Sequence, residues 1–264
     1  MTLEVLVSTI SFLLATSTEN MVPHPTYTNN HLAYNSANNY ALHPNLSPSL
    51  ALSLWSTPTT HSDITSIFRR YLQGTLSANP WSEDAPSPET EIIKSQLMSL
   101  NDKGWWTMAS QPAVNGVSSG HPVFGWGPKR GGFVYQKPFV ELFLPASDWN
   151  TLREKLEKRG NEFTYFAGNA AGEFQASDEE SLNPVTWGAF KGKEIITPTI
   201  IEAVSFREWQ EEAFVIWREW GSVFAKGSES AKLLDDLRGD LWLVNVIGHD
   251  FVDGEGLWQV LLEG

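Results

Sequence analysis

The sequence predicts an α+β fold in which largely antiparallel β-sheets are flanked by helices. Its 264 residues are 41% hydrophobic and include 14 Phe and 12 Trp, which is enough for a substantial buried core. Helix-like and strand-like patterns alternate irregularly, without the even β-α-β rhythm of a parallel sheet or barrel. No internal repeat accompanies them. These observations favour one large mixed domain.

The N-terminal segment differs from this domain. Residues 17–58 are rich in Asn, Ser, Thr, Pro and His and show few periodic apolar positions. We therefore predict an irregular or disordered arm over 1–53 and one domain over 54–264. The first 20 residues include a short apolar stretch, so a secretory signal is an alternative. The basic segment of such a signal is missing, however, and Glu4 stands in its place.

Two helices are expected at the start of the domain. The first has its apolar residues at helical spacing and a stop at Gly74. Its apolar positions are Ile64, Ile67, Phe68, Tyr71 and Leu72. In the second, Ser87 suits the N-cap, Pro88 the first helical position and Glu89 the positive end of the helix dipole. Gly104 ends that helix.

A β-rich region follows. Strands are expected at 105–109, 132–137, 139–144, 163–167 and 185–190. A helix over 149–159 interrupts them, with Trp149, Leu152 and Leu156 pointing inward and Gly160 as its stop. Because helices and strands interleave irregularly here, without a β-α-β rhythm, a largely antiparallel arrangement is favoured.

The last third begins with the clearest helix signal. Ser205 and Glu208 form an S-x-x-E capping box. A broad apolar face follows, made of Phe206, Trp209, Ala213, Ile216, Trp217, Trp220 and Phe224. A short helix is expected near 231–237, and strands at 241–247 and 257–262 complete the chain.

Composition excludes several classes of function. The absence of cysteine rules out disulfides, thiolate metal sites and a cysteine nucleophile, and it fits a reducing compartment. The formal net charge of −13 disfavours nucleic acid and anionic membrane surfaces as partners, because phosphate binding requires clustered Lys and Arg. No run reaches the roughly 20 apolar residues that a membrane helix needs.

No catalytic constellation emerges from the motifs. Nucleophile elbows, P-loops and HExxH zinc motifs are absent from the sequence. The glycine cluster at 125–132 precedes a strand and contains Pro128, so it is interpreted as a hairpin-like turn. Neither His121 nor His249 has a carboxylate or serine at a spacing that would indicate a catalytic partner. The residues by themselves indicate a soluble binding or regulatory domain without a metal site.

A series of short strings carries more specific information. In order, they are Asn79-Pro80-Trp81, Glu89-Thr90, Trp106 to Pro112, Asn115-Gly116, Gly125 to Pro128, Gly131-Gly132, Tyr135-Gln136-Lys137, Val185 to Gly188, Glu194-Ile195-Ile196, Pro198-Thr199, Glu212-Ala213-Phe214, Leu243-Val244-Asn245 and Leu257 to Val260. In this order and spacing they resemble the C-terminal regulatory domain of eukaryotic methylenetetrahydrofolate reductases. The similarity is weak from about Leu54 and strong from Pro80 to Val260.

The resemblance implies a binding site for S-adenosylmethionine, which inhibits such reductases, and for S-adenosylhomocysteine, which competes with it. Carried over by position, the site residues are Ser82, Ser87, Pro88, Glu89, Thr90, Thr107, Met108, Ala109, Ser110, Gln111, Thr186 and Thr199. Ser82 departs from the family, which often has Asn there.

The residue types suit this ligand. Glu89 offers a charge-assisted partner to its ammonium or sulfonium, and Thr186 and Thr199 offer hydroxyl donors to its carboxylate. Groups around Thr107 to Ser110 could read the adenine edge. The structural alternatives are that Glu89 only stabilises a helix start and that the threonines only pack in strands.

The resemblance also implies what acts with this domain. In the family a TIM-type barrel with FAD and NADPH precedes it, and such a barrel needs about 250 residues. Fewer than 60 precede the match, so we expect no catalysis and no bound cofactor from this chain alone. A cytoplasmic location, a homodimer and a reductase catalytic domain as partner are expected. The alternatives are an orphan dimerisation or interaction module without ligand sensing, and a secreted protein.

Overall fold

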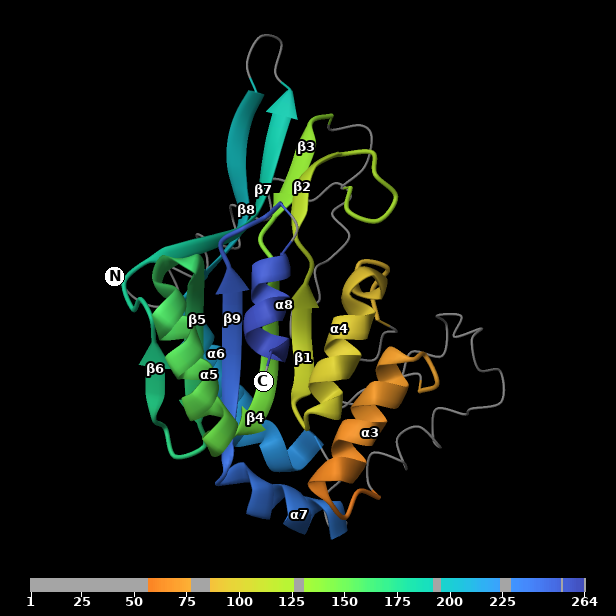
Figure 1. Ribbon diagram of the computed structural model, residues 1–264, viewed down its shortest axis with the longest axis vertical. Coiled ribbons are helices and arrows are strands. Elements are labelled where there is room, and N and C mark those ends of the chain that lie inside the picture. Colours follow the sequence, from red (N-terminus) through yellow and green to blue (C-terminus); the bar gives the residue numbers. More distant parts are fainter. Residues whose placement is uncertain are drawn as a thin grey trace.

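The computed structural model confirms the α+β class (Figure 1) and describes residues 57–76, 86–125, 131–191, 196–223, 229–252 and 254–263. The predicted arm over 1–53 lies outside these residues and stays a prediction. The described helices are α3 (His61–Leu72), α4 (Thr90–Asp102), α5 (Ala146–Arg159), η2 (Gly160–Glu162), α6 (Phe206–Val223), α7 (Glu229–Arg238) and α8 (Glu255–Leu262). The described strands are β1 (Trp106–Gln111), β2 (Val114–Ser118), β3 (Phe133–Gln136), β4 (Phe139–Pro145), β5 (Phe163–Asn169), β6 (Phe174–Ala176), β7 (Leu182–Lys191), β8 (Ile196–Ser205) and β9 (Leu241–Gly248).

The described strands form two antiparallel sheets. A five-stranded sheet has the order β1-β4-β9-β5-β6, and a four-stranded sheet has the order β2-β3-β7-β8. The second sheet extends beyond one end of the first (Figure 1). The largely antiparallel arrangement predicted from the irregular interleaving of helices and strands is therefore confirmed.

The five-stranded sheet carries the core and is covered on both faces. Every residue of β9 is buried, as are the first six residues of β4. On one face Trp149 of α5 packs against Tyr165 and Trp242, with ring centres 5.3 and 6.0 Å apart. On the other face Trp217 of α6 packs against Phe143. Both faces of β4 are buried, because helices cover the sheet on both sides.

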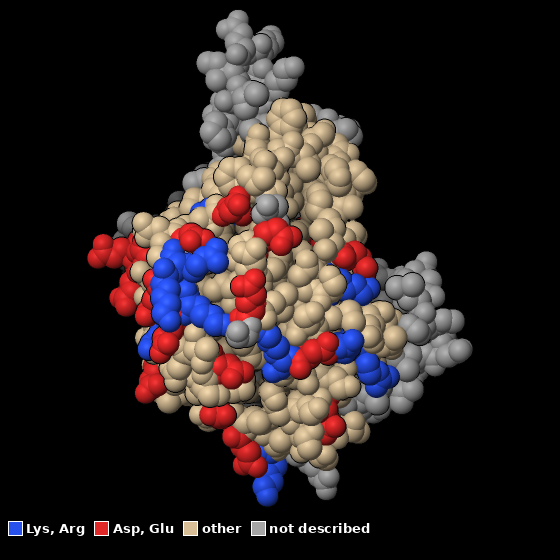
Figure 2. Space-filling model, viewed as in Figure 1, with Lys and Arg blue, Asp and Glu red and all other residues tan. Residues whose placement is uncertain are grey.

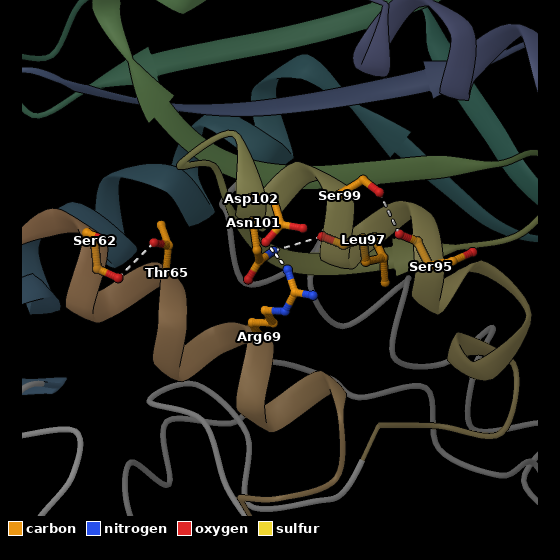
Figure 3. A network of polar contacts seen from close by, with 8 residues as sticks. All are labelled: Ser62, Thr65, Arg69, Ser95, Leu97, Ser99, Asn101 and Asp102. Atoms are coloured by element: carbon orange, nitrogen blue, oxygen red, sulfur yellow. Dashed lines mark hydrogen bonds and ion pairs between the residues drawn. The ribbon is translucent and has the colours of Figure 1, made fainter.

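Helices α3 and α4 pack together at the β1 edge of this sheet. Thr60 and Asp63 form a capping box at the start of α3. Arg69 of α3 forms an ion pair with Asp102 at the end of α4 (Figure 3). Both side chains are partly exposed, so this pair fixes the geometry of the two helices more than it stabilises them.

Two of the crossings between the sheets are only two residues long. The chain passes from β1 to β2 through Pro112 and Ala113, and from β3 to β4 through Lys137 and Pro138. The backbone N–H of Lys137 donates to the carbonyl of Val185 in β7, 2.8 Å away. We call this place, where β1 leads into β2 and β3 leads into β4 beside β7, the sheet junction.

The local signals for α5 and α6 are confirmed. Trp149, Leu152 and Leu156 are the buried residues of α5, and Gly160 ends it at φ 57°. At the start of α6 the backbone N–H of Glu208 donates to Ser205 Oγ, 3.2 Å away, as the capping box predicted. These elements depend on contacts within a few residues, which explains why the sequence reveals them.

The strand expected at 257–262 is wrong, because this segment is helix α8. The buried residues Leu257, Trp258, Val260 and Leu261 fit one helical face, and a short apolar run does not distinguish helix from strand. The start signal was Gly254, which caps α8 in the left-handed conformation. Strands β2, β6 and β8 were not predicted from the sequence. In β2 and β6 few positions are fully buried, so their apolar pattern is weak.

Gly254 allows a test of this conformational requirement. A Cβ at Gly254, where φ is +70°, would lie 3.3 Å from Ala113 and from Pro138 at the sheet junction. We expect Gly254→Ala to lower the free energy of unfolding by about 2–3 kcal/mol, since backbone strain of about 1–2 kcal/mol adds to the crowding. Gly172→Ala is the control, because φ there is +84° and nothing lies within 4 Å of the added carbon. Equal losses in urea unfolding of the two variants would contradict the crowding.

Candidate functional site

The start of α4 is the first part of the candidate site. Thr90 begins the helix, and Glu89 is the N-cap, without a side-chain cap bond. Ser87 was predicted to be the N-cap, and this is wrong. The backbone N–H of Thr90 donates to the Ser87 carbonyl, and the hydroxyls of Ser87 and Thr90 are 3.0 Å apart. The segment from Ser87 thus makes its own turn before the helix, with Pro88 exposed and Glu89 half-buried.

Strand β1 supplies the second part. Thr107 is buried, and its hydroxyl accepts a hydrogen bond of 3.2 Å from Nδ2 of Asn101 in α4. The register with β4 shifts between Thr107 and Ala109, which places a bulge at Met108. Met108, Ala109 and Ser110 are half-buried, whereas Gln111 is buried. The bulge changes the side-chain alternation along the strand in the middle of the predicted site.

The start of α4 and the end of β1 lie at the same level of the fold. Asp102 ends α4 only a few residues before β1 begins, and β1 runs back along the helix. Thirteen helical residues and six strand residues each span about 20 Å. The arrowhead of β1 is accordingly beside the upper end of α4 (Figure 1). Ser110 and Gln111 therefore lie toward the start of α4, as a site made of both segments requires.

Gln111 links β1 to the second sheet. Its Nε2 donates to the carbonyl of Lys137, 2.9 Å away, and to that of Val185, 3.3 Å away. Its Oε1 accepts from Thr186 Oγ1 over 3.4 Å, which is long for such a bond. The side chain of Gln111 thus positions Thr186 of β7 at the sheet junction.

For two of the predicted site residues, Ser82 and Thr199, the structure gives less information. Ser82 lies outside the described residues. Thr199 belongs to β8, where its backbone pairs with Gly188, two positions along β7 from Thr186. The register therefore brings the β8 backbone at Thr199 close to Thr186, as the predicted site requires.

Behind this site lies a half-buried lysine. Burial lowers the pKa of Lys137, whose Nζ lies 5.5 Å from the centre of the Trp187 ring. Burial and the charge of Lys137 lower the pKa of His249, and His249 Nε2 lies 2.8 Å from Thr164 Oγ1. Lys137 belongs to one of the motifs shared with the family, but the sequence did not indicate that it lies near the site. Its burial depends on the crossing between the two sheets.

Other kinds of site receive no support from the described residues. No group of three or more His, Asp or Glu side chains among them is arranged to hold a metal ion. No described helix is both long and apolar enough to cross a membrane. On the face drawn in Figure 2, one group of basic side chains lies at the left with acidic side chains around it, and elsewhere acidic and basic side chains are interspersed.

Comparisons with a family model and with curated proteins point to the same protein family. Residues 13–263 match the family described as "MTHFR, SAM-binding regulatory domain". The chain is 45% identical over 230 residues to methylenetetrahydrofolate reductase 2 of Schizosaccharomyces pombe, covering 87% of this chain and 36% of that protein. It is 43% identical over 205 residues to methylenetetrahydrofolate reductase (NADH) 1 of Zea mays, covering 76% of this chain and 34% of that protein. The chain thus spans about a third of the length of the curated relatives it matches.

Proposed function

Since the chain belongs to the family of methylenetetrahydrofolate reductase S-adenosylmethionine-binding regulatory domains, we propose that it binds S-adenosylmethionine and S-adenosylhomocysteine at the sheet junction. Such binding would control reduction of methylenetetrahydrofolate in one-carbon metabolism and methionine synthesis. Competition between the two ligands at one site makes the domain a sensor of their ratio.

One observation carries the proposal. The end of β1 and the middle of β7, which lie far apart in the sequence, meet at Gln111, and the start of α4 lies at the level of the end of β1 (Figure 1). We propose that these three segments together supply a carboxylate, hydroxyls and amides beside buried apolar residues, which is the usual make-up of a small-molecule site. A purely structural role would not require polar groups from separate elements to converge in this way.

The proposed roles follow from the chemistry of the residues. Glu89 binds the ammonium of the ligand, or the sulfonium of the methylated form, through a charge-assisted contact. Groups from Thr107 to Ser110 bind the adenine edge. Thr186 and Thr199 donate to the carboxylate, and the single Thr186 hydroxyl proton leaves its long 3.4 Å contact with Gln111 Oε1 to do so. Ser82, Ser87, Pro88 and Thr90 complete the wall beside Glu89, and Met108, Ala109 and Gln111 complete the wall along β1.

Replacing Glu89 by glutamine tests the proposal. We expect Glu89→Gln to weaken binding of S-adenosylmethionine about 10-fold or more, because a hydrogen bond to a charged group contributes about 1.5–3 kcal/mol. Calorimetric titration of the whole 264-residue chain with each ligand measures this change.

Glu91→Gln is the matched control for that titration. Glu91 lies two residues further along α4, is exposed and pairs with Lys94 at 2.9 Å, so its loss should leave affinity within about twofold. No heat from the unchanged, folded chain with either ligand would contradict the proposed function. Equal affinity of Glu89→Gln and the unchanged chain would contradict the role of Glu89.

We also propose that reduction itself takes place in the FAD- and NADPH-binding part of such reductases. This 264-residue chain, assayed alone with FAD and NADPH, is then expected to show no reduction of methylenetetrahydrofolate. A homodimer is proposed as its state of assembly. Light scattering during the titration distinguishes sensing from dimerisation alone: a dimer that binds neither ligand would favour the interaction module.

A further inference from the structure

A buried side chain beside the proposed site has a polar atom that no group of the described residues satisfies. Gln136, the last residue of β3, is only 6% exposed. Its Nε2 has no hydrogen-bond partner within the part of the chain that the structure describes. Buried amide groups are paired in the great majority of cases, and an unmet one costs about 1–3 kcal/mol. A donor retained at such a cost indicates a partner from outside the fold.

The register of the second sheet places Gln136 next to Thr186. The two residues are direct antiparallel partners in β3 and β7, so their side chains share one face of the sheet with Cβ atoms about 4.5–5.5 Å apart. Thr186 is itself buried and contacts Gln111. The unsatisfied amide of Gln136 thus lies one side chain away from a residue of the proposed site.

The two glutamines at the sheet junction differ in what they bind. The amide of Gln111 is occupied on both sides, by two backbone carbonyls and by the Thr186 hydroxyl. It therefore holds the junction together and has little capacity for a ligand. Gln136 has no corresponding contacts for its nitrogen, so an N–H group remains at the same junction.

An amide N–H beside a hydroxyl suits a carboxylate. A carboxylate has only acceptor sites, and two neighbouring neutral donors satisfy them without adding a buried charge. The Thr186 hydroxyl has one proton, which becomes available to the ligand when it turns away from Gln111 Oε1, its long contact of 3.4 Å. Bonds of this type, with one ionised partner, are roughly twice as strong as those between neutral groups. The ammonium and the sulfonium of the ligand cannot accept the amide proton, so within the amino-acid end only the carboxylate fits.

We infer that Gln136 binds the amino-acid carboxylate of the effector together with Thr186, and that it makes the site selective for ligands that keep this carboxylate. The inference rests on the proposed function, because it assigns a new ligand contact within that site. It goes further by naming which chemical group of the ligand the sheet junction selects.

The test compares two ligands that differ in the carboxylate alone. S-adenosylmethionine and its decarboxylated form both keep the adenosine, the sulfonium and the ammonium. Calorimetric titration of the 264-residue chain is carried out with each, for the unchanged protein and for Gln136→Leu. We expect the substitution to weaken binding of S-adenosylmethionine about 10-fold or more, and to change binding of the decarboxylated ligand less than about twofold.

Two further variants make the result interpretable. Gln136→Glu keeps the size and polarity of the side chain, and it should weaken S-adenosylmethionine binding at least as much, because two carboxylates repel. Gln259→Leu, on the exposed side of α8, should leave both affinities unchanged. If Gln136→Leu fails to fold, the comparison between the two ligands is made with Gln136→Glu.

The possible outcomes separate the two proposals. If the unchanged chain binds S-adenosylmethionine and the Gln136 variants bind it equally well, the role of Gln136 is overturned while the proposed function stands. Equal weakening for both ligands would also overturn it, since the effect would then be structural. Absence of any binding to the unchanged, folded chain overturns the proposed function and this assignment with it.

Discussion

Replacing Phe143 by alanine is expected to lower the free energy of unfolding by about 3–5 kcal/mol. Phe143 is fully buried in β4, which lies between β1 and β9 in the five-stranded sheet. Its ring makes edge contacts with Trp106 of β1 and Trp217 of α6, with ring centres 6.1 and 5.1 Å apart. The substitution therefore removes buried apolar area and leaves a cavity between two large rings that cannot move together without shifting a strand and a helix.

Urea unfolding followed by circular dichroism measures this loss. The matched control is Phe214→Ala, since Phe214 is a phenylalanine of α6 that is 58% exposed. Its loss should change the free energy of unfolding by no more than about 0.5 kcal/mol. A Phe143→Ala variant as stable as the control would show that the interface between α6 and the sheet does not depend on this ring.

The second large effect concerns a buried carboxyl. Burial, and to a smaller extent the carboxyl of Glu141, raise the pKa of Glu212 from 4.5 to about 8. Glu212 lies on α6, which packs against the sheet face that carries Glu141 of β4. Glu141 is only 3% exposed, and its Oε2 accepts a hydrogen bond of 2.7 Å from Trp209 Nε1. Two carboxyl groups thus share a region of low polarity beneath one helix.

The sign of the pH effect follows from proton binding. Between pH 4.5 and about 8 the unfolded chain has released the proton of Glu212 while the folded chain keeps it. The free energy of unfolding therefore falls as the pH rises through this window, by at most about 1.36 kcal/mol per pH unit. Below the window the carboxyl is protonated in both states, and this contribution is constant.

Glu212→Gln is expected to remove this fall in stability. A neutral amide of similar shape needs no proton at any pH, so the variant should be more stable than the unchanged chain at pH 8, by about 2 kcal/mol or more, and similar to it at pH 5. Urea unfolding at pH 5, 6, 7 and 8 gives both profiles. Glu211→Gln is the control, because Glu211 is exposed and paired with Arg207. Parallel profiles for Glu212→Gln and the unchanged chain would contradict the raised pKa.

Elements built from short-range contacts were predictable from the sequence. The capping box at Ser205, the stop at Gly160 and the inward stripe of α5 each depend on residues within a few positions of one another. Strands β4 and β9 were also found, because each is an apolar run interrupted by a single polar residue, Glu141 in β4 and Asn245 in β9. The two local errors, the N-cap at Ser87 and the strand at 257–262, occurred where a short pattern fitted two conformations.

The candidate site was predictable only in part. The order and spacing of the motifs shared with the family predicted the site residues. In the structure, two of them, Gln111 and Thr186, are in contact. No pattern within either segment showed that they meet, because 74 residues separate them and their contact depends on how two sheets join. The same reason hid Gln136, whose unsatisfied amide becomes visible only when β3 is paired with β7.

The sequence by itself determined the α+β class, most helices and central strands, and the resemblance to the family to which the chain belongs. These depend on local periodicity, capping and the order of motifs, all of which are written along the chain. The tertiary structure alone decided that both faces of the five-stranded sheet are buried, that α8 is a helix and that polar groups from β1, β3 and β7 meet at the sheet junction. These features depend on the burial of side chains and on the pairing of distant segments. Both arise only when the chain folds.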